Sequence, residues 1–132
     1  MDGMIKELLN MKIGAKVGSF NMSAIAYCDD ILLISSNEGH MQLLLDKCAE
    51  YSVDWKLSFN PSKSSLYSLL KSNFKFKLSG KPISRVDGFI YLGLPVGDNN
   101  FIESTYLERM KKCERAFYSL RSIGYSPLKL HP

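Results

Sequence analysis

The stretch from Ser23 to Ser35 places two adjacent carboxylates between two short apolar runs. Ala24-Ile25-Ala26-Tyr27 precedes Asp29 and Asp30, and Ile31-Leu32-Leu33-Ile34 follows them. Apolar runs of this length that are bounded by Ser and Asn are typical of buried strands. The sequence therefore predicts two strands with the carboxylates at the bend between them.

A hairpin tip that carries Asp29 and Asp30 has two interpretations. The tip keeps both carboxylates at a surface, where desolvation does not oppose their ionisation, and a tight turn can direct both into one cleft. Two fixed carboxylates suit Mg²⁺, which takes one or two protein carboxylates and completes its shell with water and substrate phosphates. Asp-Asp is also ordinary turn chemistry, so a solvated turn is the alternative.

Three short motifs resemble, in the same order, those of reverse transcriptases. Tyr27-Cys28-Asp29-Asp30 resembles their Tyr-x-Asp-Asp signature and, more narrowly, the Tyr-Ala-Asp-Asp form of the non-LTR (LINE-type) retrotransposon enzymes. Asn60-Pro61-Ser62-Lys63-Ser64 is similar to the Asn-x-x-Lys-Thr segment after the catalytic hairpin, and Tyr91-Leu92-Gly93 is similar to the Tyr-Leu-Gly of the primer-grip region. Cys28 in place of alanine and Ser64 in place of threonine are mild departures. A looser resemblance extends from about Ile5 to the C-terminus.

The resemblance implies RNA-directed DNA synthesis by two-metal nucleotidyl transfer, with an RNA template, a DNA primer and an incoming dNTP as partners. Asp29 would be the principal catalytic Mg²⁺ ligand, Asp30 would assist it, and Tyr27 would lie near the primer terminus or the nucleotide. In that family the hairpin that carries Tyr91, Leu92 and Gly93 positions the 3′ end of the primer. Lys63 either approaches the nucleotide phosphates and offsets charge on the leaving pyrophosphate, or fastens its own turn.

The metal site of the family also requires an aspartate from an earlier strand. Only Asp2 precedes the hairpin, and its surroundings match no such motif. We therefore expect a fragment that lacks the N-terminal half of the polymerase and does not polymerise DNA alone. The alternatives are a non-catalytic nucleic-acid-binding remnant and a relic without function.

Charge is divided unequally along the chain. Residues 1–55 carry four Lys and eight acidic residues, whereas residues 56–132 carry thirteen Lys or Arg and five acidic residues. An acidic metal-type site beside a basic flank is what a phosphodiester substrate requires. The alternative is that the lysines only keep hairpin edges soluble and monomeric.

Hydrophobic periodicity predicts the elements that follow the acidic hairpin. A helix over residues 38–52 would begin at a Ser35–Glu38 capping box. Its buried face would consist of Met41, Leu44, Leu45 and Cys48. Alternation at Trp55, Leu57 and Phe59 predicts a half-buried strand, and a turn at residues 60–62 leads to a second strand over residues 64–70. Residues 89–97 suit a tight hairpin.

The most regular pattern lies near the C-terminus, where apolar residues recur at alternating steps of four and three. These residues are Tyr106, Met110, Cys113, Phe117 and Leu120. The spacing predicts a helix of about 18 residues with a single apolar seam, ended by Gly124. The resemblance implies that this is the first helix of the polymerase thumb.

These patterns predict an α+β fold, with an antiparallel palm-type sheet that carries the catalytic-type Asp-Asp hairpin, one backing helix and a C-terminal thumb-type helix. The resemblance divides the chain into a partial palm, residues 1–97, and the start of a thumb, residues 98–132. Cys28, Cys48 and Cys113 lack metal-ligand spacing and are expected to be buried reduced thiols, which suits an intracellular protein of the nucleus or the cytoplasm. No apolar run approaches ~18 residues, so no membrane span is expected.

Overall fold

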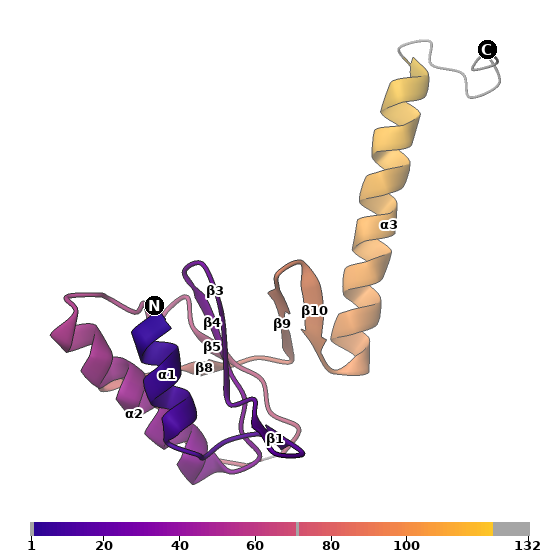
Figure 1. The fold of residues 1–132 in the computed structure, drawn as a ribbon. Helices are drawn as coiled ribbons and strands as arrows, with labels where there is room; N and C mark the ends of the chain where they lie inside the picture. The colour runs from indigo at the N-terminus through magenta and orange to yellow at the C-terminus, as the bar shows by residue number, and fades with distance from the viewer. Residues whose placement is uncertain (1, 71, 123–132) are drawn as a thin grey trace. The chain divides into compact units, whose positions relative to one another are not determined.

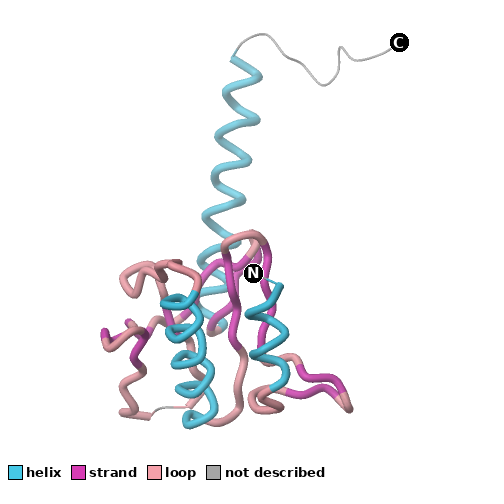
Figure 2. The backbone as a smooth tube through the Cα atoms, turned by 60° about the vertical axis from the view of Figure 1, so that its left-hand side comes forward, coloured by secondary structure: helices cyan, strands magenta, loops and turns pink. Residues whose placement is uncertain are grey.

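A computed structural model describes residues 2–70 and 72–122 of the chain (Figures 1 and 2). The described residues form three helices and ten short strands, so the expected α+β class is confirmed. The chain divides into two compact units, unit 1 over Met1–Val86 and unit 2 over Asp87–Pro132. No helix within the described ranges combines the length and the hydropathy that a membrane span needs.

Unit 1 alternates helices with short strand pairs. Its helices are α1 (Asp2–Asn10) and α2 (Glu38–Asp54). Antiparallel ladders join β1 (Lys16–Val17) to β2 (Phe20–Asn21), β3 (Ala24–Tyr27) to β4 (Asp30–Leu33), and β6 (Lys77–Leu78) to β7 (Lys81–Pro82). A parallel ladder joins β5 (Ser65–Leu66) to β8 (Ser84–Arg85).

The core of unit 1 lies between its two helices and the strands that they cover. Helix α1 contacts α2 and β3, and α2 contacts β6 (Figure 1). Met4, Leu8 and Leu44 are fully buried. The other buried apolar residues are Ala24, Leu45, Cys48, Tyr51, Phe76 and Leu78. Because each large apolar side chain that leaves water completely contributes roughly 1.5–3 kcal/mol, this cluster is the main source of stability in unit 1.

Helix α2 extends over Glu38–Asp54, close to the predicted range, but its start differs from the prediction. The N-cap is Asn37, whose Oδ1 accepts a hydrogen bond from His40 N–H at 3.1 Å. Ser35 instead accepts a hydrogen bond from Asn37 N–H through its Oγ, at 3.1 Å. The predicted Ser35–Glu38 capping box is therefore wrong, because Asn is at least as good an N-cap as Ser and stands closer to the helix.

The single antiparallel sheet expected from the sequence is not observed among the described residues. Their strands form five separate two-stranded ladders, one of which is parallel. Residues with positive φ lie beside or within these short ladders: Gly14 (φ 85°) precedes β1, Gly18 (φ 60°) lies in the β1–β2 turn, and Gly80 (φ 76°) lies in the β6–β7 turn. Such conformations depart from extended backbone, so pairing ends after a few residues.

The predicted strand over Trp55, Leu57 and Phe59 is also wrong. These residues follow α2 as a turn and a loop, and Trp55 is 65% exposed. Trp55 N–H donates to the Tyr51 carbonyl at 3.1 Å, and the two rings stack with centroids 5.6 Å apart. These contacts between residues four apart hold Trp55 at the end of α2, so the alternating pattern does not lead to a strand. The second predicted strand, over residues 64–70, is shortened to β5.

Unit 2 contains the tight hairpin predicted over residues 89–97. Strand β9 (Gly88–Tyr91) pairs with β10 (Leu94–Gly97) in antiparallel register, and the turn residues Leu92 and Gly93 have φ of 49° and 81°. Two positive φ values are the pattern of a type I′ turn, which matches the twist of the strands. Pro95 is opposite Ile90, one pair from the turn, where an antiparallel ladder needs no N–H donor.

Phe101 fastens the hairpin of unit 2 to its helix, α3 (Asn99–Ser122). A Cβ atom added to Gly88 would lie 2.3 Å from the Phe101 ring, and one added to Gly97 would lie 2.9 Å from it. Gly88 and Gly97 are partners across the ladder, so their paired lack of side chains makes room for the ring. Asp98 Oδ1 accepts a hydrogen bond from Phe101 N–H at 2.7 Å, as an N-cap residue does.

Helix α3 spans 24 residues and begins earlier than the seam predicted. The seam itself is uncovered in the described structure, since Tyr106 is 50%, Met110 62% and Phe117 47% exposed. Gly124, the predicted end of the helix, lies outside the described residues.

The contact between Gly88 and Phe101 predicts a steric coupling that denaturation can measure. Gly88→Ala should lower the free energy of unfolding by about 1–3 kcal/mol, because the new methyl group overlaps the ring. In a Phe101→Ala background, where the ring is absent, Gly88→Ala should lower the free energy of unfolding much less. Urea unfolding followed by circular dichroism checks this, and strictly additive losses would contradict the contact.

Candidate functional site

The hairpin that carries Asp29 and Asp30 is anchored at its open end. Beyond the β3–β4 ladder, Ile34 N–H donates to the Ser23 carbonyl at 2.8 Å, and Ala15 N–H donates to the Ile34 carbonyl at 2.9 Å. Asn21 Nδ2 donates to the Leu9 carbonyl at 2.8 Å, and Asn21 Oδ1 accepts from Ser23 N–H at 2.9 Å. The side chain of Asn21 therefore ties the start of the hairpin to the end of α1.

Gly14 allows this anchor to close. Its φ is 85°, and a Cβ atom there would lie 2.5 Å from the Ser23 Cβ and 2.9 Å from the Ile34 carbonyl oxygen. Neither atom can move away easily, because the Ser23 Cβ is attached directly to the backbone of the hairpin base and the Ile34 carbonyl is part of that backbone. The sequence patterns assigned no role in the site to Gly14 or to Asn21. An isolated glycine within a strand-like pattern is a signal of close backbone approach and could have indicated the first of them.

The tip of the hairpin is a two-residue turn formed by Cys28 and Asp29. Tyr27 and Asp30 are direct partners on either side of it. Cys28 has a φ of 51° and Asp29 has no positive φ, which is the φ pattern of a type II′ turn. A positive φ is sterically unfavourable for a residue other than glycine. The pairing of Tyr27 with Asp30 therefore holds Cys28 in a backbone conformation that it would not otherwise prefer.

The two faces of the hairpin differ. Side chains alternate along a strand, and direct partners share a face, so Tyr27 and Asp30 lie on one side together. The opposite side carries Ala24, which is buried, and Ile31 and Leu33, which pack against the buried cluster. Asp30 therefore belongs to the face that turns away from the core of unit 1.

Asp29 and Asp30 are both exposed, and within the described structure no hydrogen bond or ion pair engages either carboxylate. Free carboxylate oxygens on a rigid turn are suitable ligands for a hard divalent cation. No group of three or more His, Cys, Asp or Glu residues that could hold a metal occurs in the part of the chain that the structure describes. The pair could supply two ligands to such a cation, and the rest of its coordination shell would come from water or from a bound phosphate.

Lys63 lies in a separate turn of unit 1 that Asn60 organises. Asn60 O accepts hydrogen bonds from the N–H groups of Lys63 and Ser64, at 3.0 and 3.1 Å, and Asn60 Oδ1 accepts one from Ser62 N–H at 3.0 Å. The Lys63 side chain is exposed and takes part in none of the turn's hydrogen bonds. Its ammonium group is therefore available to an anion.

Tyr91, Leu92 and Gly93 lie at the tip of the β9–β10 hairpin in unit 2. Leu92 and Gly93 are exposed, and a Cβ at Gly93 would meet nothing within 4 Å. The Tyr91 hydroxyl is buried and has no hydrogen-bond partner among the described residues. The site residues predicted from the sequence thus lie on three turns. Tyr27, Asp29 and Asp30 share the acidic hairpin tip, Tyr91, Leu92 and Gly93 share the β9–β10 tip, and Lys63 lies alone on the third turn.

Arg85, one of the basic residues that follow Lys56, is already engaged. Its Nη1 donates to the Ser72 carbonyl, and its Nη2 donates to the Leu70 carbonyl at 3.0 Å. Lys75, Lys77 and Lys81 are exposed. The basic flank that could contact a phosphate backbone therefore consists of lysines, whereas Arg85 holds a loop.

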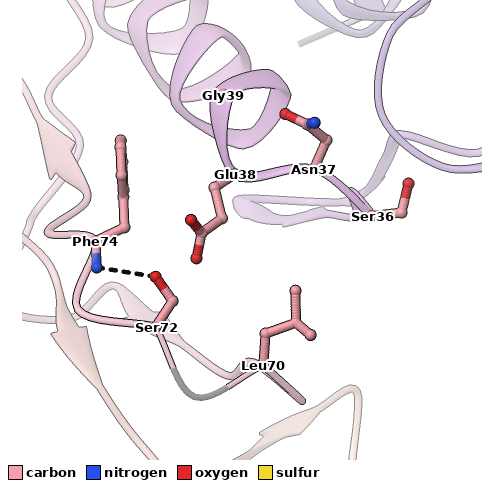
Figure 3. A pocket seen from close by; sticks show the side chains of 7 residues that line it. All are labelled: Ser36, Asn37, Glu38, Gly39, Leu70, Ser72 and Phe74. Carbon is pink, nitrogen blue, oxygen red and sulfur yellow. Dashed lines mark hydrogen bonds between the residues drawn. The ribbon is translucent and has the colours of Figure 1, made fainter.

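A hollow of about 430 Å³ opens beside the first turn of α2 (Figure 3). Its lining residues are Ser36, Asn37, Glu38, Gly39, Leu70, Ser72 and Phe74. The Glu38 side chain points toward Ser72, and its buried Oε1 has no hydrogen-bond partner within the described residues. None of the site residues predicted from the sequence lines this hollow.

The three cysteines divide differently from the prediction that all are buried. Cys48 is buried in α2, whereas Cys28 and Cys113 are exposed. Cys28 is exposed because it occupies the hairpin turn, and Cys113 because nothing in the described structure covers its face of α3. Burial raises the pKa of the Cys48 thiol to about 11.

This division predicts a two-step thiol titration. Cys28 and Cys113 should react readily with a thiol reagent at pH 8, whereas Cys48 should react only after denaturation. A raised pKa leaves Cys48 with a smaller thiolate fraction at any pH below it, and only the thiolate attacks the reagent. Mass spectrometry of the labelled native chain checks the assignment. Labelling of Cys48 at the rate of Cys28 would show that α2 does not pack as described.

The profile of the reverse transcriptase (RNA-dependent DNA polymerase) family matches residues 1–96, which include the acidic hairpin, the Lys63 turn and the β9–β10 hairpin up to Val96. No curated protein and no solved structure matches the chain. Since the family profile covers most of the sequence, the chain belongs to the reverse transcriptase family.

Proposed function

We propose that the chain is part of an RNA-directed DNA polymerase domain of the non-LTR type, with residues 1–97 as a partial palm and residues 98–132 as the start of a thumb. The observation that carries the proposal is the placement of Tyr27 and Asp30 on one face of a short hairpin whose other face packs against the core. In such an arrangement the helices pack against one face of the strands, and the carboxylates would face the substrate on the other side. The family match over residues 1–96 supports this role.

The ligands suit Mg²⁺, with Asp29 as the principal ligand and catalytic residue and Asp30 assisting it. When bound, Mg²⁺ would supply Lewis-acid stabilisation of charge during nucleotidyl transfer. The chain contributes the fixed position of its carboxylates, because the turn is closed by the β3–β4 ladder and anchored through Asn21. Tyr27, partner of Asp30, would contact the primer terminus or the incoming dNTP.

Two further turns would contribute to substrate binding. The exposed ammonium group of Lys63 would offset negative charge on the nucleotide phosphates. Tyr91, Leu92 and Gly93 would hold the primer 3′ end, and the open space around Gly93 permits a nucleic-acid strand to approach the backbone closely.

Two carboxylates are an incomplete donor set for two-metal catalysis. No third carboxylate joins Asp29 and Asp30 within the described residues. The 132-residue chain alone should therefore bind a divalent cation weakly and not support polymerisation.

Metal binding can be located residue by residue. Mn²⁺ added to the ¹⁵N-labelled chain should first broaden the amide signals of residues 27–31, because a paramagnetic ion relaxes the nuclei nearest to it. The double variant Asp29→Asn/Asp30→Asn should abolish this selective broadening. Asp46→Asn/Asp54→Asn, which changes two other acids of unit 1, is the matched control and should leave it intact. Equal broadening in the variant and the parent would sink the proposed metal role.

Polymerase activity has a separate expected outcome. In primer extension on a homopolymer RNA template with Mg²⁺, incorporation by the chain should not exceed that of its Asp29→Asn variant. Incorporation above that control would show that the chain completes its own metal site. Such a result would overturn the proposed inactivity and would strengthen the polymerase assignment.

A non-catalytic nucleic-acid-binding remnant is the second candidate. Lys56, Lys63, Lys75, Lys77 and Lys81 are exposed and lie in a stretch without acidic residues, and they favour this candidate. Salt-dependent binding of an RNA–DNA duplex that is unchanged by removal of Mg²⁺ and by Asp29→Asn would support this candidate, provided that the Mn²⁺ experiment shows no selective broadening.

A further inference from the structure

Helix α3 carries an apolar stripe that begins after its first turn. Phe101 in the first turn packs on the β9–β10 hairpin, and α3 then runs past that hairpin (Figure 1). The stripe comprises Tyr106, Met110, Cys113, Phe117 and Leu120, all of them exposed. Over 14 residue steps it extends about 21 Å along the helix.

The stripe has the spacing of a coiled-coil seam. Steps of four and three place Met110 and Phe117 at heptad position a, and Tyr106, Cys113 and Leu120 at position d. The outward positions b, c and f are mostly polar or charged between Glu108 and Ser119, as a solvated surface requires. An isolated helix of this composition leaves its a and d side chains in water, which is unfavourable unless a second helix covers them.

We propose that α3 is a self-association surface, and that its partner is α3 of a second copy of this chain in parallel, in-register orientation. Charge complementarity at the flanks of the seam favours a second copy in this orientation. Arg109 occupies position g and Glu114 occupies position e of the following heptad. In a parallel pair each g residue faces the e residue five positions later on the other helix, so Arg109 of one copy meets Glu114 of the other, twice per dimer.

The same two residues do not satisfy each other within one helix. Neighbours on a helix surface are three or four residues apart, whereas Arg109 and Glu114 are five apart. Neither takes part in an ion pair within the described structure. Both charges are therefore available to a partner.

An antiparallel pair would not use these charges. There g residues face g residues, and the g positions of α3 in the described range are Ile102, Arg109 and Ala116, none of them acidic. Arg109 would have no carboxylate to meet in any register. Charge complementarity thus favours the parallel dimer over the antiparallel one.

Sedimentation of the full chain under reducing conditions, from about 5 µM to about 500 µM, measures the self-association. The parent chain should show a reversible monomer–dimer equilibrium, and Phe117→Lys should remain monomeric with unchanged circular dichroism at 222 nm. A parent chain that is monomeric over the whole range would overturn the proposal, whether another part of the chain covers the seam or nothing does.

Charge reversal tests the orientation. Arg109→Glu and Glu114→Arg should each weaken the dimer about tenfold, because each change replaces two attractive pairs with two repulsive ones. The double variant Arg109→Glu/Glu114→Arg should restore the parent dissociation constant. Lys111→Glu at an outward position is the matched control and should leave the constant within about twofold. Failure of the double variant to recover, or equal weakening by Lys111→Glu, would refute the parallel arrangement.

Discussion

The structure of unit 1 depends on one close approach, that of Gly14 to the base of the acidic hairpin. At this point the loop after α1 passes against Ser23 and the Ile34 carbonyl, with Leu44 of α2 nearby, at distances that a side chain would block. The contact brings α1, α2 and the β3–β4 hairpin to one place. The hairpin is held in place at its base. Its tip therefore keeps its position although the Asp29 and Asp30 side chains make no hydrogen bond or ion pair within the described residues.

The base of the hairpin makes the stabilising contacts, and the tip is left exposed to solvent. Burial of Ala24, with Ile31 and Leu33 packed against the core, stabilises one face of the strands, and the cross-strand register then dictates what appears on the other. The positive φ of Cys28 is tolerated because the ladder and the anchor determine the turn. Carboxylates in this position remain exposed to solvent, while the stabilising interactions lie elsewhere.

Unit 2 uses glycine in a different way. In unit 1, Gly14 alone allows the hairpin base to approach closely. In unit 2, the paired Gly88 and Gly97 together make room for the Phe101 ring. The ring and the Asp98 cap hold the first turn of α3 against the hairpin, so hairpin and helix form one body. The remainder of α3 has no comparable contact in the described structure, and the residues of its apolar seam are exposed there.

The sequence by itself determined the local features. The α+β class, the helix now defined as Glu38–Asp54, the β9–β10 hairpin and the heptad spacing of α3 follow from periodicity and turn chemistry within a few residues. Tertiary structure decided the rest, because those features depend on residues far apart in the chain. Asn21 reaches Leu9, and Gly14 meets Ser23 and Ile34. No local pattern encodes such contacts, so the anchor of the site and the division into separate ladders emerged only once the chain was folded.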